Sequence, residues 1–531
     1  MSRAFRRPIL AAFGAASLLA VGSAGAGVVY HVDVDAPSGG GAGTSWANAF
    51  KSLQLAFDTA MPGDEIWVKQ GVYVTPGTAY LMREGTAVYG GFAGVETARS
   101  QADPSSNPTI LDAQKVSRVL AMSGAGPTVM DGFTLRNGLT GDEGGGALYD
   151  YHLEVDFSRC DFVGNKAVGG DGGAVKFYGG DVSFTDCRFI DNVAGNAEGG
   201  AVEHYGGDVW FERCVFDGNK SIVAGVYRSY GGSCTFLNSL FVRNRAFGTA
   251  SIADTYQSTM RFIHCTATMN TADGDYAVDT AQSNVEVHNS IFHGNTYNAA
   301  YFGTGKPFPG AVTVTHSVVE TGFPGQGNVD ADPNFIQPSA DDFRPLFPSP
   351  VLDAGDSSQV PAGVTIDLAG APRFVDLAAV GDTGFGPPPH PDMGAYEAQC
   401  ENPPVAYGDG CVGAGSLVPQ IVVNSCPAIG APLALVFTNA VGGSTAIVFA
   451  GAGMGNVPIG QYCTFLVHPI LPPLFSLPLG GSGPGNGHAV LSGVVPPTTP
   501  VGAVVTWQFF VMDPNAGDGF AASPGLRLTF N

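Results

Sequence analysis

Apolar and polar residues alternate in a repeating pattern along the middle of the chain. Between about residues 130 and 320, runs of four to six residues show this alternation, which is the period of a β-strand and not of a helix. Three such runs, separated by Gly-Gly and by Asp or Asn turns, recur every 25 to 27 residues. The repeat is clearest in GGAVKFYGGDVSFTDCRFIDN (172–192) and GGAVEHYGGDVWFERCVFDGN (199–219).

Aligned on Cys187, the repeats share a few fixed positions. A cysteine or serine recurs at Cys160, Cys187, Cys214, Ser239, Cys265, Ser290 and Ser317. Five residues later stand Asn165, Asn192, Asn219, Asn244, Asn270 and Asn295, preceded in the series by Asn137. Phenylalanine occupies the column three residues before the alignment point, at Phe157, Phe184, Phe211, Phe236 and Phe262, and a second column two residues after it.

This period predicts one structural unit per repeat that buries its apolar face only against its neighbours. Three strands per unit describe one coil of a parallel β-solenoid, with consecutive coils about 4.8 Å apart. Like residues then stack, with Phe on Phe inside the solenoid and Asn on Asn at a bend. Asparagine suits such a bend because it tolerates left-handed backbone and can form hydrogen bonds along the stack. We expect an all-β fold with roughly eleven coils.

The repeats, with their Gly-Gly-Ala and Phe-x-x-x-Asn or Phe-x-x-Asn signatures, resemble those of right-handed parallel β-helix proteins of the pectin-lyase-like superfamily, including the chlamydial polymorphic outer-membrane proteins. The segments YHVDVDAPSGGGAGTSWANAF, SLQLAFDTA and PGDEIWVKQGVY resemble the first strand and short helix that precede coil one in that family. Leu53, Ala56, Phe57 and Ala60 form one apolar helical face, which can cover the open end of the core.

Two further segments resemble known modules. SPVLDAG, DLAGAPR and DMGAYE (349–397) resemble the closing segment of β-helices called choice-of-anchor Q proteins. After residue 406, charge nearly vanishes and strands alternate with Gly/Pro turns, which is typical of a β-sandwich. This region resembles a C-terminal module of exported planctomycete and related bacterial proteins.

These patterns divide the chain into six parts. We expect a signal peptide (1–26), an N-terminal strand and capping helix (27–63), a parallel β-helix (64–345), its C-terminal cap (346–397), a linker (398–406) and a small all-β, β-sandwich-like domain (407–531).

The first 26 residues predict export. Arg3, Arg6 and Arg7 precede an apolar run over 9–21, and Ala24-x-Ala26 fits a cleavage site. An uncleaved anchor and twin-arginine export are the alternatives. The mature chain, which has no other stretch of membrane-spanning length, is expected outside the cell, on its surface or in the periplasm. The formal net charge of −22 argues against nucleic acid and anionic lipid as partners, while oligomeric state stays open.

Nine cysteines in an exported chain suggest oxidation. Cys160, Cys187 and Cys214 stand on adjacent coils, so they can form one disulfide or a ladder of buried small side chains. Cys400, Cys411, Cys426 and Cys463 can form two bridges in any of three connectivities.

Function is expected where the repeat varies. Eleven residues before the alignment point the chain has Tyr149, Lys176, Glu203, Arg228, Asp254, Asp279 and Lys306, and two residues later Tyr151, Tyr178, Tyr205, Tyr230 and Tyr256. Strand parity places both columns on one outer face. Tyrosines beside charges predict a polysaccharide or cell-surface glycan site with Lys176 among its ligand-binding residues; a surface ion ladder with packed tyrosines is the alternative.

A catalytic interpretation uses the same residues. The resemblance implies lyases with an Arg or Lys base and acidic calcium ligands, which Arg228 with Glu203, Asp254 and Asp279 can supply. Neighbouring carboxylates also suit a double-displacement glycosidase. The chain lacks the pectate lyase and polygalacturonase motifs, such as Trp-x-Asp-His and Gly-His-Gly. We therefore expect a non-catalytic structural or adhesive protein with polysaccharide binding, and retain a lyase or hydrolase as the alternative.

The closing segment contains candidate metal ligands. Asp353, Asp367, Asp392 and Glu397 can gather around a calcium ion, which prefers oxygen ligands. The alternative is that these acids cap turns in a terminal lid.

Overall fold

The computed structural model describes residues 27–530, apart from 38–39, 124–125, 152–153, 275, 298–299, 304–309, 347–348, 378–379, 400–401, 403, 424–425, 428 and 431. The expected signal peptide, Lys306 and Cys400 lie outside the described residues. The described chain is nearly all β, with very little helix, and the predicted fold class is confirmed. Its contacts define two units: residues up to 331 with 358–371 and 393–395, and residues 332–357, 372–392 and 396–531.

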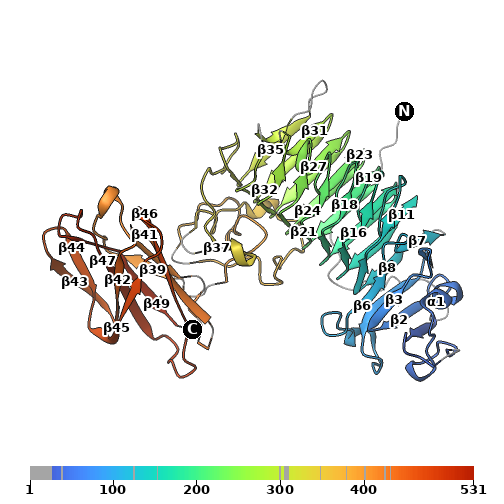
Figure 1. The fold of residues 1–531 in the computed structure, drawn as a ribbon, viewed down its shortest axis with the longest axis horizontal. Helices are drawn as coiled ribbons and strands as arrows, with labels where there is room; N and C mark the ends of the chain where they lie inside the picture. Colours follow the sequence, from blue (N-terminus) through green and yellow to red (C-terminus); the bar gives the residue numbers. More distant parts are fainter. Residues whose placement is uncertain are drawn as a thin grey trace. The chain divides into compact units, whose positions relative to one another are not determined.

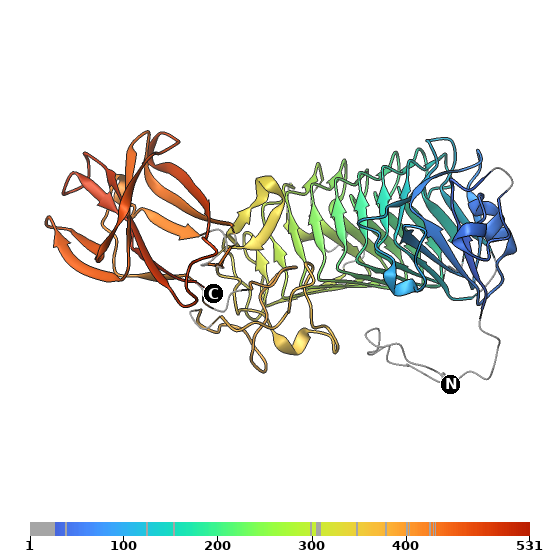
Figure 2. The same cartoon turned by 90° about the horizontal axis from the view of Figure 1, so that it is seen from below.

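The first unit is a parallel β-helix whose coils follow one another along its axis (Figure 1, Figure 2). Its first sheet contains β1 (Val29–Val32), β2 (Glu65–Lys69), β5 (Ala87–Phe92), β8 (Thr128–Asp131), β12 (Val155–Ser158), β16 (Asp181–Thr185), β20 (Asp208–Glu212), β24 (Ser233–Leu237), β28 (Thr259–Ile263), β32 (Asn284–His288) and β35 (Ala311–Thr315). The second contains β3 (Gly71–Val74), β6 (Thr109–Asp112), β9 (Phe133–Arg136), β13 (Asp161–Val163), β17 (Arg188–Ile190), β21 (Val215–Asp217), β25 (Leu240–Val242), β29 (Thr266–Thr268), β33 (Ile291–Phe292) and β36 (Val318–Val319).

Two more sheets complete the coils. The third contains β4 (Tyr80–Arg83), β7 (Leu120–Ser123), β11 (Leu148–Tyr151), β15 (Val175–Tyr178), β19 (Val202–Tyr205), β23 (Tyr227–Tyr230), β27 (Ala250–Tyr256), β31 (Tyr276–Ala281) and β34 (Ala300–Gly303). The short fourth sheet contains β10 (Leu139–Thr140), β14 (Lys166–Ala167), β18 (Val193–Ala194), β22 (Lys220–Ser221), β26 (Arg245–Ala246) and β30 (Thr271–Ala272). The described part of the solenoid makes about nine turns, so the prediction of roughly eleven coils was too high.

The predicted stacking of like residues is confirmed. Phe184 pairs in register with Phe157 and Phe211, and the ring centroids lie 5.0 and 4.9 Å apart. Both columns of phenylalanine are buried in the core of the solenoid. Helix α1 (Leu53–Thr59) buries Leu53, Ala56 and Phe57 in the same core, as the apolar pattern predicts.

The asparagines form a buried hydrogen-bond ladder. Asn219 donates its Nδ2 to Asn244 Oδ1 at 2.9 Å and to the carbonyl oxygen of Phe189 at 2.9 Å. Its Oδ1 accepts from the backbone and side-chain nitrogens of Asn192. The left-handed backbone expected at these asparagines belongs instead to the preceding residue, such as Asp191 (φ 52°) or Gly218 (φ 68°). The prediction of the hydrogen bonds was right and that of the backbone was wrong, except at Asn137 (φ 56°).

The cysteines of the solenoid are buried free thiols. Cys160, Cys187 and Cys214 stack without a disulfide, and Cys187 Sγ donates to the carbonyl oxygen of Thr185 at 3.3 Å. Burial raises the pKa of the Cys187 thiol well above its ordinary value, which disfavours the thiolate. Of the two alternatives, the structure matches the ladder of small buried side chains.

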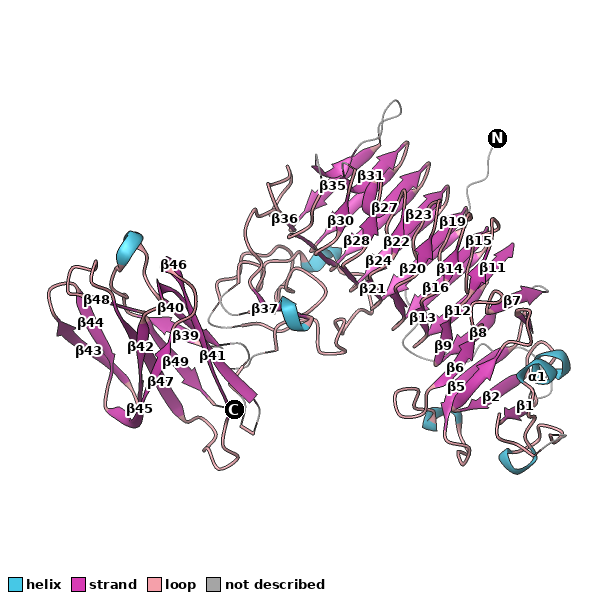
Figure 3. Cartoon of the chain, viewed as in Figure 1, coloured by secondary structure: helices cyan, strands magenta, loops and turns pink. Residues whose placement is uncertain are grey.

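The second unit contains antiparallel sheets (Figure 3). After the hairpin of β37 (Phe335–Gln337) and β38 (Asp342–Pro345), one sheet contains β39 (Val405–Tyr407), β49 (Gly525–Thr529), β47 (Val504–Met512), β42 (Thr445–Gly451), β45 (Ile470–Pro478) and β48 (Phe520–Ala522). The others contain β40 (Gln420–Val423), β41 (Pro432–Gly442) and β46 (Gly483–Val494), and β43 (Met454–Ile459) with β44 (Cys463–Val467). Phe437 and Phe509 join the two larger sheets in one core, with ring centroids 5.0 Å apart.

Cysteine pairing in the second unit is partly defined. Cys411 and Cys463 form a disulfide with Cα atoms 5.0 Å apart, and Cys426 is also disulfide-bonded. No helix within the described ranges combines the length and apolar character needed to span a membrane.

Candidate functional site

The two outward columns lie in register on the third sheet, on strands that run side by side in Figure 3. We call Tyr151, Tyr178, Tyr205, Tyr230 and Tyr256 the tyrosine row, and Tyr149, Lys176, Glu203, Arg228, Asp254 and Asp279 the charge row. Each member pairs with its counterpart on the next strand, except that Tyr256 is followed by Ala281. The predicted common face is confirmed, whereas its role in binding stays a prediction.

The tyrosine row is stacked ring on ring. The centroids of Tyr178 and Tyr205 lie 4.5 Å apart, and those of Tyr205 and Tyr230 lie 4.8 Å apart, with nearly parallel planes. Tyr151 stacks on Tyr178 at 5.1 Å and is the most exposed of the row, at 60%. In the middle of the row the ring faces therefore contact one another and are not open to a sugar ring. Ring edges and hydroxyls remain for a ligand.

Two cations of the charge row pair with acids from loops, and Arg228 also pairs with its neighbour in the row, Asp254. Lys176 Nζ lies 2.6 Å from Asp171 Oδ2, and its side chain is only 7% exposed. Arg228 Nη1 lies 3.2 Å from Glu198 Oε1. Asp171 and Glu198 lie in the loops before β15 and β19, and of the alternative ion ladder along the row the structure contains the pair of Arg228 with Asp254.

Glu203 is the most unusual member of the charge row. Its side chain is fully buried, and neither carboxylate oxygen has a hydrogen-bond partner. One oxygen each of Asp171, Glu198 and Glu203 lie within 4.8 Å of one another. Asp171 and Glu198 were not among the residues predicted from the sequence, although both stand directly before Gly-Gly-Ala at the same place in the repeat.

Arg228 is enclosed by its partners. Its Nε lies 3.3 Å from Asp254 Oδ1, and its Nη2 donates to the Tyr230 hydroxyl at 2.5 Å. That hydroxyl in turn donates to Glu198 Oε2 at 2.8 Å. With a side chain 12% exposed, Arg228 can reach a substrate carbon only by breaking these contacts.

Asp254 has the properties of a proton donor. Burial raises its pKa to about 7; Arg228 opposes the rise, while Asp279 and Glu198 add to it. Asp254 pairs in register with Asp279 on β31. The Oδ1 atom of Asp279 accepts a hydrogen bond from the amide of Thr280. Two acids on neighbouring strands with one pKa near neutrality can serve acid–base chemistry.

The acids of the closing segment are arranged differently from the prediction. Asp392 accepts from the amides of Asp353 and Ala398, and Glu397 accepts from those of Asp392 and Val375. Glu397 Oε2 also lies 3.3 Å from the guanidinium of fully buried Arg373. These contacts match the turn-capping alternative for Asp392 and Glu397.

Asp367 and Asp353 complete that set. Asp367 caps its own turn by accepting from the amides of Ala369 and Ala371. Asp353 instead belongs to a group with Asp376 and Asp382, whose oxygens lie within 4.8 Å of one another. Burial raises the pKa of Asp353 to about 6. The four predicted ligands thus do not form one group, and Asp376 and Asp382 were missed because no spacing in the sequence links them to Asp353.

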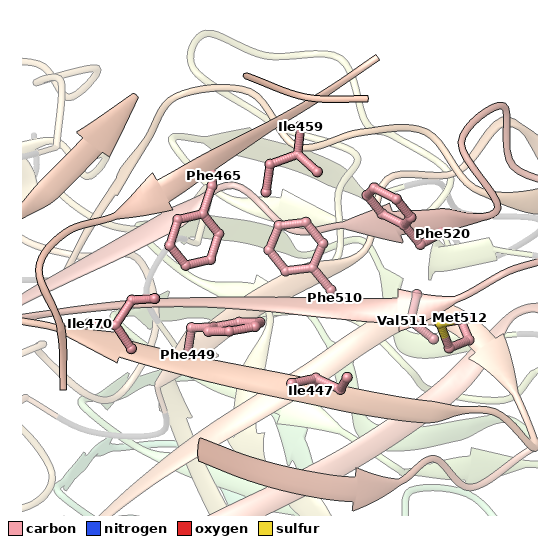
Figure 4. Close-up of a pocket in the computed structure, with 9 residues that line it drawn as sticks. All are labelled: Ile447, Phe449, Ile459, Phe465, Ile470, Phe510, Val511, Met512 and Phe520. Carbon is pink, nitrogen blue, oxygen red and sulfur yellow. The ribbon is translucent and has the colours of Figure 1, made fainter. Parts of the chain in front are cut away.

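The second unit also contains an apolar cavity of about 440 Å³ (Figure 4). Its lining includes Ile447, Phe449, Phe465, Ile470, Phe510 and Phe520. No polar group converges there to orient a ligand, so the cavity does not define a chemistry.

Comparison with known proteins identifies no family. No protein-family model matches the chain, and no curated protein matches it. Among solved structures it is similar to the enzymatically active domain of tailspike protein 4 of bacteriophage CBA120, with a TM-score of 0.30 and 12% identity. The similarity covers 88% of this chain and 64% of the tailspike chain, so this chain spans less than two thirds of that structure.

Proposed function

We propose that the protein is an exported surface or extracellular member of the pectin-lyase-like superfamily that binds polysaccharide without cleaving it. The supporting observation is the tyrosine row, in which five tyrosines occupy one outward register on successive coils. Export rests on the residues before position 27, and the superfamily and its closing segment rest on sequence resemblance. The proposed site is the outer face of the third sheet.

Hydroxyl hydrogen bonding is the proposed mode of recognition. No hydrogen bond involves the Tyr178 or Tyr205 hydroxyls among the described residues, although both side chains are partly exposed. Regularly spaced phenol groups suit the hydroxyls of an extended glycan. Since Lys176 and Arg228 are paired and largely covered, and the net charge is −22, a neutral polysaccharide is the expected ligand.

Replacing both Tyr178 and Tyr205 by phenylalanine tests this mode. The variant keeps the stacked rings but loses two hydroxyls, each contributing about 0.5–1.5 kcal/mol, so binding should weaken about fivefold or more. Affinity electrophoresis in gels containing neutral or acidic polysaccharides provides the measurement.

Trp210→Ala is the matched control, because Trp210 is an aromatic residue facing outward from the first sheet on the same coil as Tyr205. Its retention should equal that of the wild type. Equal retention of the double tyrosine variant, or migration of the wild type that no polysaccharide slows, would refute the proposed site.

Asp254 supports a second candidate function, glycoside hydrolysis. With its pKa near 7, Asp254 can act as general acid beside Asp279 on the next strand, and adjacent strands give a spacing close to the roughly 5 Å of retaining enzymes. The lyase alternative is less favoured, since it needs Arg228 as a free base.

The hydrolase candidate predicts release of reducing sugar ends that falls above pH 7, as Asp254 loses its proton. Asp254→Asn should reduce that rate at least 100-fold, the scale of acid–base catalysis. Asn284→Ala, at the exposed first residue of β32, serves as the control. This candidate would be excluded if none of the neutral or acidic polysaccharides tested yielded new reducing ends, or if Asp254→Asn kept full activity.

A further inference from the structure

We propose that Asp171, Glu198 and Glu203 bind a divalent cation, with Ca²⁺ as the ion that best fits three carboxylates. This inference goes beyond glycan binding and does not depend on it. It begins from Glu203, whose carboxylate is fully buried and has no hydrogen-bond partner for either oxygen. Removing an ionised carboxylate from water without a partner is strongly unfavourable. Either a cation compensates this group or it takes up a proton.

The neighbouring cations do not compensate Glu203. Lys176 and Arg228 occupy the same register on the strands before and after it. Lys176 pairs with Asp171, and Arg228 pairs with both Glu198 and Asp254. Three carboxylates in the cluster therefore face two basic groups, one of which is shared with a fourth acid. The local charge leaves room for an additional cation.

The geometry matches a bound calcium ion. Calcium takes oxygen ligands at about 2.3–2.6 Å, so two ligands on opposite sides of the ion are separated by about 4.6–5.2 Å. One carboxylate oxygen from each of Asp171, Glu198 and Glu203 lies within 4.8 Å of the other two. They can therefore share one ion with modest movement, while water completes the coordination.

The three ligands come from two successive coils. Asp171 lies in the loop before β15, Glu198 in the equivalent loop before β19, and Glu203 on β19 itself. The loops already contact each other, since the amide of Glu198 donates to Asp171 Oδ1 at 3.2 Å. A shared ion would fasten these loops to the third sheet beside the tyrosine row. The expected consequence is a calcium-dependent increase in the stability of these coils.

Calcium titration of the full chain tests the site. Isothermal titration after chelation counts the bound equivalents, and Tb³⁺ luminescence excited through tyrosine reports on an ion next to Tyr230, which donates to Glu198. The wild type should bind one equivalent that Glu203→Gln lacks. Calcium should raise the Tm of the wild type but not that of Glu203→Gln.

Two variants make the test specific. Glu286→Gln is the control, because Glu286 pairs with Arg261 on another face of the same solenoid and should leave binding unchanged. Asp376→Asn with Asp382→Asn removes the other acidic group, so that any ion bound there is counted separately.

Each outcome decides the proposal. If Glu203→Gln fails to fold, Glu198→Gln replaces it, since the Glu198 side chain is 27% exposed and its loss should remove the same equivalent. Unchanged binding in these variants would overturn the proposal. So would a wild type that binds no calcium, which is the behaviour expected if Glu203 is protonated. Loss of calcium binding with intact glycan retention would separate this site from the proposed function.

Discussion

Replacing Asn219 by alanine should destabilise the β-helix by about 3–6 kcal/mol, the largest effect expected of a single substitution here. Asn219 is fully buried, and its side chain takes part in four hydrogen bonds, two as donor and two as acceptor. Alanine leaves the buried Asn192 amide without its acceptor, at a cost of about 1–3 kcal/mol, and removes three further hydrogen bonds worth about 0.5–1.5 kcal/mol each. Urea denaturation followed by tryptophan fluorescence gives the free energy of unfolding.

Asn284→Ala is the matched control, since Asn284 is exposed at the start of β32. Its effect should stay within about 0.5 kcal/mol of the wild type. A loss below about 1 kcal/mol in Asn219→Ala would show that the ladder contributes little, because neighbouring coils or water replace its hydrogen bonds.

Replacing Arg373 by methionine should cost about 3–5 kcal/mol in the second unit. Arg373 and Glu397 are fully buried and 3.3 Å apart, so the variant leaves a carboxylate without its counter-charge. Burial raises the pKa of Glu397 well above its ordinary value; Asp392 adds to the rise and Arg373 opposes it. Removing the arginine should raise that pKa further.

The pH dependence of this loss follows from the raised pKa. A carboxyl group whose pKa is higher in the folded than in the unfolded protein destabilises the fold when it is ionised, and the penalty disappears as pH falls towards the unfolded value. The deficit of Arg373→Met should therefore be larger at pH 8 than at pH 5, measured by urea denaturation at both. Arg344→Met, which removes an exposed ion pair with Asp342, is the control. An equal deficit at both pH values would contradict the account of this pair.

The fold was largely predictable because the repeat is a direct consequence of stacking. Phe184 must fit Phe157 and Phe211, so the constraint appears in the sequence at a fixed period. The number of turns was less predictable, because the coils before residue 130 contain strands but lack the repeated Cys, Asn and Phe positions. The backbone at the asparagine ladder was also misjudged, because the turn places its strain on the preceding residue, such as Asp191.

The candidate site was predictable as a face but not as a set of contacts. Strand parity places Lys176, Glu203 and Arg228 in one row. It does not reveal that the loop residues Asp171 and Glu198 form ion pairs with Lys176 and Arg228. Nor does it reveal that neither carboxylate oxygen of Glu203 has a hydrogen-bond partner. A long side chain can contact residues of loops as well as its neighbours on adjacent strands. The alignment of the repeats shows only the neighbours on adjacent strands. The same limit hid Asp376 and Asp382, which approach Asp353 across the folded closing segment.

A crystal structure with an oligosaccharide prepared from a retained polysaccharide tests the proposed function most directly. The account predicts sugar density along the third sheet, with its hydroxyls hydrogen-bonded to those of Tyr178 and Tyr205 and its chain passing Tyr151. Sugar bound to another face of the solenoid, or to the second unit, with this row uncovered would contradict it.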